Sequence, residues 1–574
     1  DILALEKDIE AKREAVDLLN RRMASHEGRL DDLNDEIAVI ESANKEIEIK
    51  VQELAKQAKE LHELGASAKS DIETLVSERT QCDAKSAQLR SEERAKSAER
   101  EKISGELARL EERKAQMEQQ LENAVNKLFD EGSFVETGVF TAAKEGASSV
   151  ITGYGTVEDR PVFVYAQDFT VKGGAMGEGA AKKIVELLKL AGKTGAPVVA
   201  MADSAGADLN EGAKALNAYA RIMKETAALS GVVPQISLIL GPCAGGAAFV
   251  PELTDVVIAV EKIGQMFVTG PQVVSARTGR NVTAEDLGGA KKLVASGAAQ
   301  IAVASEDEAF AMARRVLSFL PDNNQEDAQL VSADDLNRQL DIDTYYDAHD
   351  IVARIADFND YVELTRDFAP NMVTALARLG GRSVGIVANN PAEHNGVLCA
   401  SACKKAARFI RLCDCFNIPV VTLVNTPGQN TVDEEKNAAA VSAAAQLIFA
   451  YAEAVVPKVS VLCGQAVGAA YSAMGSKAVG ADAVYAWPKA YIAPINAEAA
   501  VRILEKEEIR AGKPVAELAK FYEENNGALA AAEEGLCDDV IEPAATRQMI
   551  AAALEMLMGK REVALPRKHG NLPL

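Results

Sequence analysis

The sequence predicts an α/β protein in which two tandem copies of one domain follow a long α-helical coiled coil. Two observations lead to this prediction: a heptad pattern through the first part of the chain, and a repeat at an offset of 222 residues (Gly174 to Gly396) through the rest. We therefore expect four segments: a coiled coil over 1–128, a first domain over 129–320, a linker over 321–343 and a second domain over 344–574.

Length and composition limit the classes of protein to which the chain can belong. At 574 residues it exceeds what one hydrophobic core supports. Its net charge of −23 argues against nucleic-acid binding, and it has no run of 18 apolar residues that would span a membrane. The eight cysteines form no CxxC pair, so we expect reduced thiols, no metal site and a cytoplasmic location.

Residues 1–128 carry the helical pattern. The first proline of the chain is Pro161, and apolar residues hold a heptad register from Ile2 to Leu128. Asn44 occupies an a position, a polar insertion that sets register in paired helices, while the seam is poor over 79–100. The partner of this helix is a second copy, another protein or its own second half; the pattern does not decide among them.

The first copy shows alternating strands and helices. Apolar runs at 162–166 and 198–202 predict buried strands, and residues 179–190 predict a helix between them, which favours parallel pairing. A further apolar run at 236–240 leads into Gly241-Pro-Cys-Ala-Gly-Gly-Ala-Ala248, which predicts a strand, a tight turn and a helix start.

The turn after this strand is a candidate oxyanion hole. Gly245 and Gly246 let the backbone turn sharply, and the N–H groups at a helix start have no partner inside the helix. Two such amides could hold a thioester oxygen that becomes negatively charged. The same residues would equally suit a helix that packs closely on a strand.

The repeat argues for the functional interpretation. At the offset of 222 without a gap, the matching segments are Gly246-Ala-Ala-Phe249 with Gly468-Ala-Ala-Tyr471, Asp203-Ser204 with Asn425-Thr426, and Lys182-Lys183 with Lys404-Lys405. Each copy is thus expected to offer one turn of backbone amides. We also expect residues 382–388 to form the opening strand of the second copy.

A series of motifs resembles a known family and occurs in that family's order. They are Leu128–Phe134, Gln167–Val171 with Gly173 and Gly174, Gly241–Gly246, Met266–Pro271, Leu287–Ala290, Lys405–Phe409, Asn417–Pro419 and Ala486–Pro488. From about residue 128 onward the chain resembles the carboxyltransferase (beta) subunits of biotin-dependent acyl-CoA carboxylases of the acetyl- and propionyl-CoA type. It also resembles the related subunits of biotin-dependent decarboxylases.

This resemblance implies two crotonase-like domains and a reaction in which carboxybiotin and an acyl-CoA meet between the copies. The biotin would be carried on a separate protein, so the implied partners are a biotin carboxyl carrier protein, a biotin carboxylase and the acyl-CoA. Further copies of the chain are implied as well, in a hexamer-type ring or as dimers. A membrane would be involved only through a partner, if the complex were a decarboxylating pump.

The resemblance also assigns roles to matching positions. It gives the catalytic role of holding the two enolates to backbone amides: Gly245 and Gly246 for one, and Gly468, Ala469 and Ala470 for the other. It gives substrate binding to a second set: Gly173, Gly174, Ala205, Gly206, Lys182, Lys183, Tyr471 and Ser472. Ser472 occupies a position linked to acyl-group selectivity, although a hydroxyl at a helix start is an equal explanation, and the lysines suit either CoA phosphates or a solvated helix face.

The chain departs from the family pattern at four places. The family's basic segment ahead of the first motif is missing, and Asp208 replaces an arginine, which weakens phosphate binding unless another cation substitutes. The second turn, Gly464–Tyr471, lacks two charges and one glycine, so Ala469 can donate its N–H only if its φ is negative. Residues 492–498 replace a segment that usually carries Met-Gly.

Three functions follow from these observations. The first is a carboxyltransferase that moves a carboxyl group between carboxybiotin and a short acyl-CoA. The second is a decarboxylase subunit acting on malonyl-, methylmalonyl- or glutaconyl-CoA, since the same enolate forms in either direction. The third is a non-catalytic scaffold that uses its coiled coil, suggested by Asp208 and the altered second turn.

Overall fold

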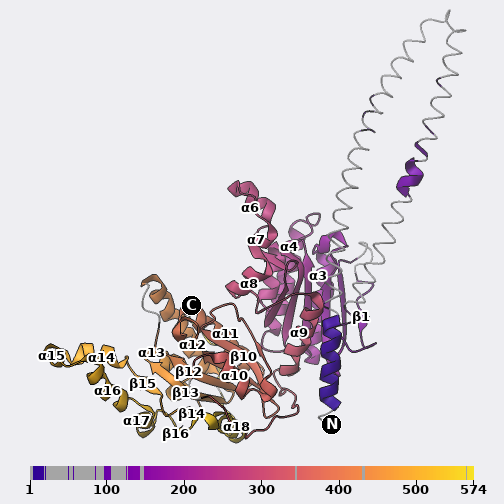
Figure 1. Cartoon of the computed structure of the whole chain (residues 1–574). Helices are drawn as coiled ribbons and strands as arrows, with labels where there is room; N and C mark the ends of the chain where they lie inside the picture. The colour runs from indigo at the N-terminus through magenta and orange to yellow at the C-terminus, as the bar shows by residue number, and fades with distance from the viewer. Residues whose placement is uncertain are drawn as a thin grey trace, which may run out of the picture. The chain divides into compact units, whose positions relative to one another are not determined.

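The computed structural model describes residues 4–18, 20, 50, 53, 56, 85, 93, 96–97, 99–104, 125, 127–141, 148–342, 345–429, 434–563 and 565–573 (Figure 1). Most of the predicted coiled coil lies outside these residues; within it, 4–18 and 99–104 are helical. Two compact units are present, 23–123 and the remainder of the chain, and the following description concerns the second. No helix of the described residues is long and apolar enough to cross a membrane.

The first copy is built on an eight-stranded sheet in the order β1-β2-β3-β4-β5-β6-β8, with β7 paired to β5. Its strands are β1 (Val135–Thr137), β2 (Val150–Val157), β3 (Arg160–Gln167), β4 (Val198–Ser204), β5 (Gln235–Ala244), β6 (Val256–Val260), β7 (Gln265–Phe267) and β8 (Ile301–Val303). Pairing is antiparallel from β1 to β3 and parallel from β3 onward. The parallel strands expected at 162–166 and 198–202 are thus confirmed as β3 and β4.

The second copy repeats this sheet in the order β16-β14-β13-β12-β11-β10-β9, with β15 paired to β13. Its strands are β9 (Tyr361–Glu363), β10 (Met372–Leu379), β11 (Arg382–Asn389), β12 (Val420–Thr426), β13 (Lys458–Val467), β14 (Ala483–Ala486), β15 (Tyr491–Ala493) and β16 (Asp539–Val540). Residues 382–388 do form a strand, β11, but the prediction that they open this copy is wrong, because β9 and β10 precede them.

Helices connect the strands in both copies. In the first copy they are α3 (Glu178–Thr194), α4 (Ala213–Leu229), α5 (Phe249–Glu252), α6 (Pro271–Thr278), α7 (Ala284–Gly288), α8 (Ala290–Ser296) and α9 (Glu306–Phe319). In the second they are α10 (Ala348–Ile355), α11 (Ala400–Cys415), α12 (Glu434–Glu453), α13 (Ala469–Ala473), α14 (Ala497–Leu504), α15 (Lys506–Arg510), α16 (Val515–Asn525), α17 (Ala528–Glu533) and α18 (Thr546–Leu557). Short 3₁₀ turns that matter for the site are η4 (Lys172–Gly174), η5 (Gly245–Ala248) and η7 (His394–Gly396).

Helix α3 shows how the sequence produces a helix that packs on the sheet. Its apolar residues recur at helical spacing, so Ala180, Ile184, Leu187 and Ala191 form one buried stripe that packs with α4 on the central strands. The helix ends where Gly195 adopts a left-handed conformation, φ +66°. The strands it covers are buried almost throughout, as expected of parallel strands.

A buried ion pair fixes the C-terminal helix α18 to the second copy. The guanidinium of Arg547 lies 2.6 Å from the carboxylate of Asp357, and both side chains are at most 1% exposed. Asp357 also accepts the N–H groups of Gly380 and Gly381 at 3.1 and 2.7 Å. Removing one partner would therefore leave an uncompensated buried charge.

Arg547→Ala should lower the free energy of unfolding by about 3–5 kcal/mol, because Asp357 would stay buried without its counter-ion. The midpoint of urea unfolding measures the change. Arg502→Ala is the matched control: its ion pair with Glu498 is 3.8 Å long and about two-thirds exposed, so its loss should cost about 0.5 kcal/mol or less. Equal midpoints for the two variants would show that the buried pair does not stabilise the fold.

Candidate active site

The two backbone turns lie at the carboxyl ends of equivalent parallel strands, the edge at which α/β sheets bind ligands. Gly245 follows β5 with φ +62°, and Gly468 follows β13 with φ +67°. In each copy a helical turn begins at once, η5 in the first and α13 in the second. Both strands thus deliver a helix start to the same edge.

The structure corrects the pairing of the two turns. Val198 pairs with Gln235 in the first sheet, and Val420 pairs with Lys458 in the second, so the offset is 222 at β4 but 223 at β5. Gly245 therefore corresponds to Gly468, and Gly246 corresponds to Ala469. The gapless repeat, which paired Gly246 with Gly468, is wrong by one residue from β5 onward.

This register shows which amides can face a ligand. The N–H of Gly468 donates to the carbonyl of Ala493 at 2.8 Å, so it is already engaged. Ala469 and Ala470 open α13, where N–H groups have no acceptor inside the helix. Ala469 is not among the residues with positive φ. The negative φ that it needs in order to donate its N–H, despite having a side chain, is therefore present. In the first copy Gly245 and Gly246 open η5, with Gly245 at the position of Gly468 and Gly246 at that of Ala469.

The two loops that precede this turn in the first copy are joined beside it. The N–H of Ala205 donates to the carbonyl of Gly173 at 2.9 Å, and that of Met176 donates to the carbonyl of Gly206 at 2.8 Å. A Cβ on Gly206 would lie 3.0 Å from the carbonyl oxygen of Ala244, the residue before the turn. The structure therefore brings together the predicted substrate residues 173–174 and 205–206 with the predicted catalytic turn.

The lysine pair of α3 divides into one exposed and one buried residue. Lys182 is exposed and lies 3.9 Å from Glu186. Lys183 is buried, and its ammonium donates to the carbonyl of Val150 at 2.7 Å; burial lowers its pKa. This placement does not suit the phosphate contact expected of Lys183. In the second copy Lys405 is buried in the same way.

Tyr471 and Ser472 lie on α13, directly after the second turn, and both are half-buried. Burial raises the pKa of the Tyr471 hydroxyl. A hydroxyl at a helix start explains Ser472 equally well, so contact of these residues with the acyl group stays a prediction.

Nothing in the local sequence singles out Lys172, which precedes the first glycine turn. Its ammonium lies 3.0 Å from the carboxylate of Asp208, the residue that stands where the family has arginine. Although Asp208 replaces an arginine, the ammonium of Lys172 supplies a cation at the same loop. Only a signal outside the local sequence could have revealed the pair, since 36 residues separate its members.

Asp203 is a second feature that the sequence did not reveal. Its carboxylate lies against Gly241 of β5, and its Oδ1 has no hydrogen-bond partner among the described residues. The corresponding Asn425 accepts the N–H of Gln465 at 2.9 Å, but Gln465 corresponds to Pro242, which has no N–H. Burial, and to a lesser degree the nearby charge of Asp168, raises the pKa of Asp203 to about 8.

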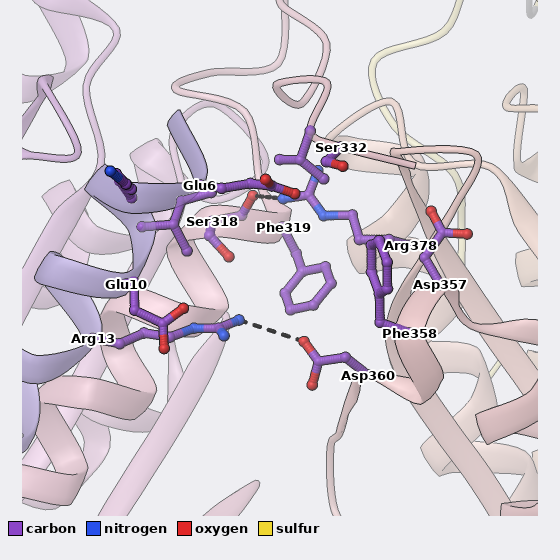
Figure 2. Close-up of a pocket in the computed structure, with 13 residues that line it drawn as sticks. Glu6, Glu10, Arg13, Ser318, Phe319, Ser332, Asp357, Phe358, Asp360 and Arg378 are labelled. Carbon is purple, nitrogen blue, oxygen red and sulfur yellow. Dashed lines mark hydrogen bonds and ion pairs between the residues drawn. The ribbon is translucent and has the colours of Figure 1, made fainter. Parts of the chain in front are cut away.

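One cavity lies away from both turns. It has a volume of about 460 Å³ and forms where the helical segment 4–18 meets the end of α9 and the start of the second copy (Figure 2). Arg13 reaches Asp360 across it at 3.4 Å, and Arg378 lies 5.0 Å from the ring centre of Phe319. None of the predicted site residues lines it, so it marks where the N-terminal helix attaches. No group of His, Cys, Asp and Glu among the described residues could hold a metal ion.

Comparisons with known proteins agree with this architecture. The carboxyl transferase domain family matches residues 114–572. Methylmalonyl-CoA decarboxylase subunit alpha of Veillonella parvula is 43% identical over 495 residues, which cover 82% of this chain and 96% of that protein. Propionyl-CoA carboxylase beta chain of Saccharopolyspora erythraea is 42% identical over 488 residues, covering 78% and 89%. The crystal structure of transcarboxylase 12S with methylmalonyl-CoA and methylmalonic acid bound is similar with a TM-score of 0.75 and 42% identity, covering 78% and 91%.

Asp203→Asn should change how stability depends on pH. The folded-state pKa of Asp203 is raised, so its contribution to stability is complete below the unfolded pKa near 4 and is lost as pH rises toward about 8. Asparagine does not titrate, so the variant should gain in stability relative to the parent protein between pH 4.5 and 8.5, as measured by urea midpoints.

Asp286→Asn supplies a control of opposite sign. The hydrogen bonds of Thr283 lower the pKa of Asp286, so this variant should lose stability relative to the parent as pH rises from below that lowered pKa to the unfolded pKa near 4, and the difference should stay constant at higher pH. A stability difference for Asp203→Asn that stays constant with pH would contradict the buried, neutral state of that carboxyl.

Proposed function

Because the chain belongs to the carboxyl transferase domain family, we propose that it moves a carboxyl group between biotin on a carrier protein and a short acyl-CoA of the methylmalonyl- or propionyl-CoA type. The observation that carries this proposal is the pair of equivalent backbone turns after β5 and β13. Relatives named for decarboxylation and for carboxylation match the chain over most of its length. These names agree on a methylmalonyl- or propionyl-CoA substrate but differ in the direction of carboxyl transfer.

The first turn suits the thioester half of the reaction. Loss or gain of the carboxyl group passes through the enolate of the thioester, whose charge resides largely on the former carbonyl oxygen. The N–H groups of Gly245 and Gly246 are fixed by η5 before any substrate binds, so they can stabilise this oxygen without reorganising. No nucleophile is required, in agreement with the absence of histidine from Gly241–Ala248.

The second turn suits the biotin half of the reaction. Biotin supplies the carboxyl group that is transferred, and a ureido oxygen needs hydrogen-bond donors of the same kind. Ala469 is exposed, and with Ala470 it offers two amides at the start of α13. We assign these two amides, and not that of Gly468, to this oxygen.

The features that suggested a non-catalytic scaffold no longer argue for one. Ala469 has the φ that it needs to donate its N–H, and Lys172 provides a cation beside Asp208. Both departures are therefore compatible with catalysis.

We further propose that the chain acts with a biotin carboxyl carrier protein and a biotin carboxylase, as an assembly of several copies. The crystal structure of transcarboxylase 12S describes a hexamer assembly. In this chain, Phe249 and Leu253 follow the first turn in sequence, the carbonyl of Val268 lies beside Gly245, and all three residues are 38–60% exposed. Apolar side chains grouped beside a site in this way suit a surface covered by a second subunit.

The function can be tested by incubating malonyl-, methylmalonyl- or glutaconyl-CoA with free biotin as acceptor and measuring the decarboxylated acyl-CoA, together with the CO₂ that carboxybiotin releases when it decomposes. We expect methylmalonyl-CoA to turn over fastest. Absence of turnover with all three, in a protein that is folded, would contradict the proposal. Addition of a carboxylated carrier protein and propionyl-CoA tests the reverse direction.

Ala469→Pro should reduce kcat by about 10²–10³-fold, because it removes one oxyanion donor. Proline suits the first position of a helix, so the fold should persist. Ala469→Ser keeps the N–H at the same exposed position and should stay within a few-fold of the parent. A Pro variant that is as active as the Ser variant would remove this amide from the mechanism.

A further inference from the structure

The loops after β3 and β4 hold a lysine above a buried carboxylate. Lys172 opens η4 with φ +54°, and its side chain is 54% exposed, whereas that of Asp208 is 5% exposed. Their charged groups are 3.0 Å apart. A molecule that approaches this edge of the sheet therefore meets the ammonium of Lys172 before it meets the carboxylate.

Asp208 is fixed by its other contacts. Its Oδ1 accepts the backbone N–H of Asn210 at 2.9 Å and the side-chain amide of Asn210 at 3.0 Å, while Oδ2 faces Lys172. The hydrogen bonds from Lys172 and Asn210 lower its pKa, so it remains charged. An ionised carboxylate with fixed oxygens restricts where the ammonium can lie.

The pair is part of the loop structure that borders the first turn. The N–H of Asp208 donates to the carbonyl of Met176 at 2.9 Å, and Ala207 forms a bridge with Met176. The same two loops carry Gly173 and Gly206, and the latter approaches the residue before the turn. Lys172 is thus tied to the site through both loops.

Lys172 is also the only basic residue in the sequences 168–176 and 203–212, which contain four acidic ones (Asp168, Asp203, Asp208 and Glu211). An acyl-CoA carries negative charge on its phosphates and, for a methylmalonyl-type substrate, on its acyl carboxylate. In a chain of net charge −23, a fixed cation at the site offsets repulsion of such a ligand. Of the next two lysines along the chain, Lys182 faces Glu186 on α3 at 3.9 Å, and Lys183 is buried and bound to the carbonyl of Val150.

We propose that Lys172 is a substrate-binding residue, held in place by Asp208, whose ammonium contacts an anionic oxygen of the acyl-CoA. This oxygen belongs either to a CoA phosphate or to the acyl carboxylate. The inference rests on the proposed function and extends it to a residue in place of the family's arginine.

The test compares steady-state kinetics of Lys172→Met, Lys172→Arg and Asp208→Asn with methylmalonyl-CoA. Loss of a charge-assisted hydrogen bond should raise KM by about 10-fold or more in Lys172→Met. Lys172→Arg should restore most of the affinity, and Asp208→Asn should give an intermediate KM because the ion pair that helps to position the cation is weakened. Lys189→Met on α3 is the control: that lysine is similarly exposed, at 56%, and pairs with Glu225 at 3.9 Å.

Two substrate analogues distinguish the sources of the anion. Methylmalonyl-pantetheine lacks the CoA nucleotide and phosphates, so the KM difference between Lys172→Met and the parent should vanish with it if a phosphate is the contact. Propionyl-CoA lacks the acyl carboxylate, so the difference should vanish with it if that carboxylate is the contact. In either case the KM of the parent should rise with salt more steeply than that of Lys172→Met.

The inference and the proposed function fail in different ways. If the parent protein transfers no carboxyl group, the proposed function itself fails. If the parent is active and Lys172→Met has the KM of the Lys189→Met control with all three thioesters, only the inference is overturned. A variant with lower kcat or melting temperature but unchanged KM would likewise show that the Lys172–Asp208 pair serves only to hold the loops.

Discussion

The candidate site depends on one backbone constraint: a buried strand must become a helix within a single residue. Gly245 and Gly468 make this change with φ near +65°, a region in which a side chain is strained. Because the change is so abrupt, the first amides of η5 and α13 remain at the sheet edge without partners in the helix. The neighbouring loops then pack around the turn, with Gly206 against Ala244.

This constraint explains why the second turn tolerates its altered sequence. The left-handed conformation is needed only at Gly468, and Gly468 is present. The following residue already has helical geometry, so the Cβ of Ala469 introduces no backbone strain. An oxyanion contact requires the N–H and not the lack of a side chain. The loss of one glycine therefore does not by itself imply loss of function.

Much of the architecture was predictable from the sequence, whereas the register and the charges of the site were not. Buried strands and the duplication followed from apolar runs and matching motifs. The offset failed after β4 because 32 residues separate Thr426 from Lys458 but 31 separate Ser204 from Gln235, and runs of Gly and Ala match at either offset. The burial of Lys183 could have been predicted, since it lies three residues after Ala180 and four before Leu187 on the apolar stripe. The contact of Lys172 with Asp208 could not, because it depends on how two loops pair.

The two copies differ at one position beside the turn, which is Asp203 in the first copy and Asn425 in the second. Asn425 carries no charge, and its Oδ1 accepts the N–H of Gln465. Asp203 faces a proline instead, and burial with a pKa of about 8 keeps it mostly protonated at neutral pH. Both copies thus place an uncharged side chain at the end of the strand that pairs with the one leading to the turn: Asp203 on β4 beside β5, and Asn425 on β12 beside β13. A fixed negative charge there would oppose the charge that an enolate develops, because electrostatic interactions are strong in a buried environment. Protonated Asp203 and Asn425 are therefore two solutions to one electrostatic requirement.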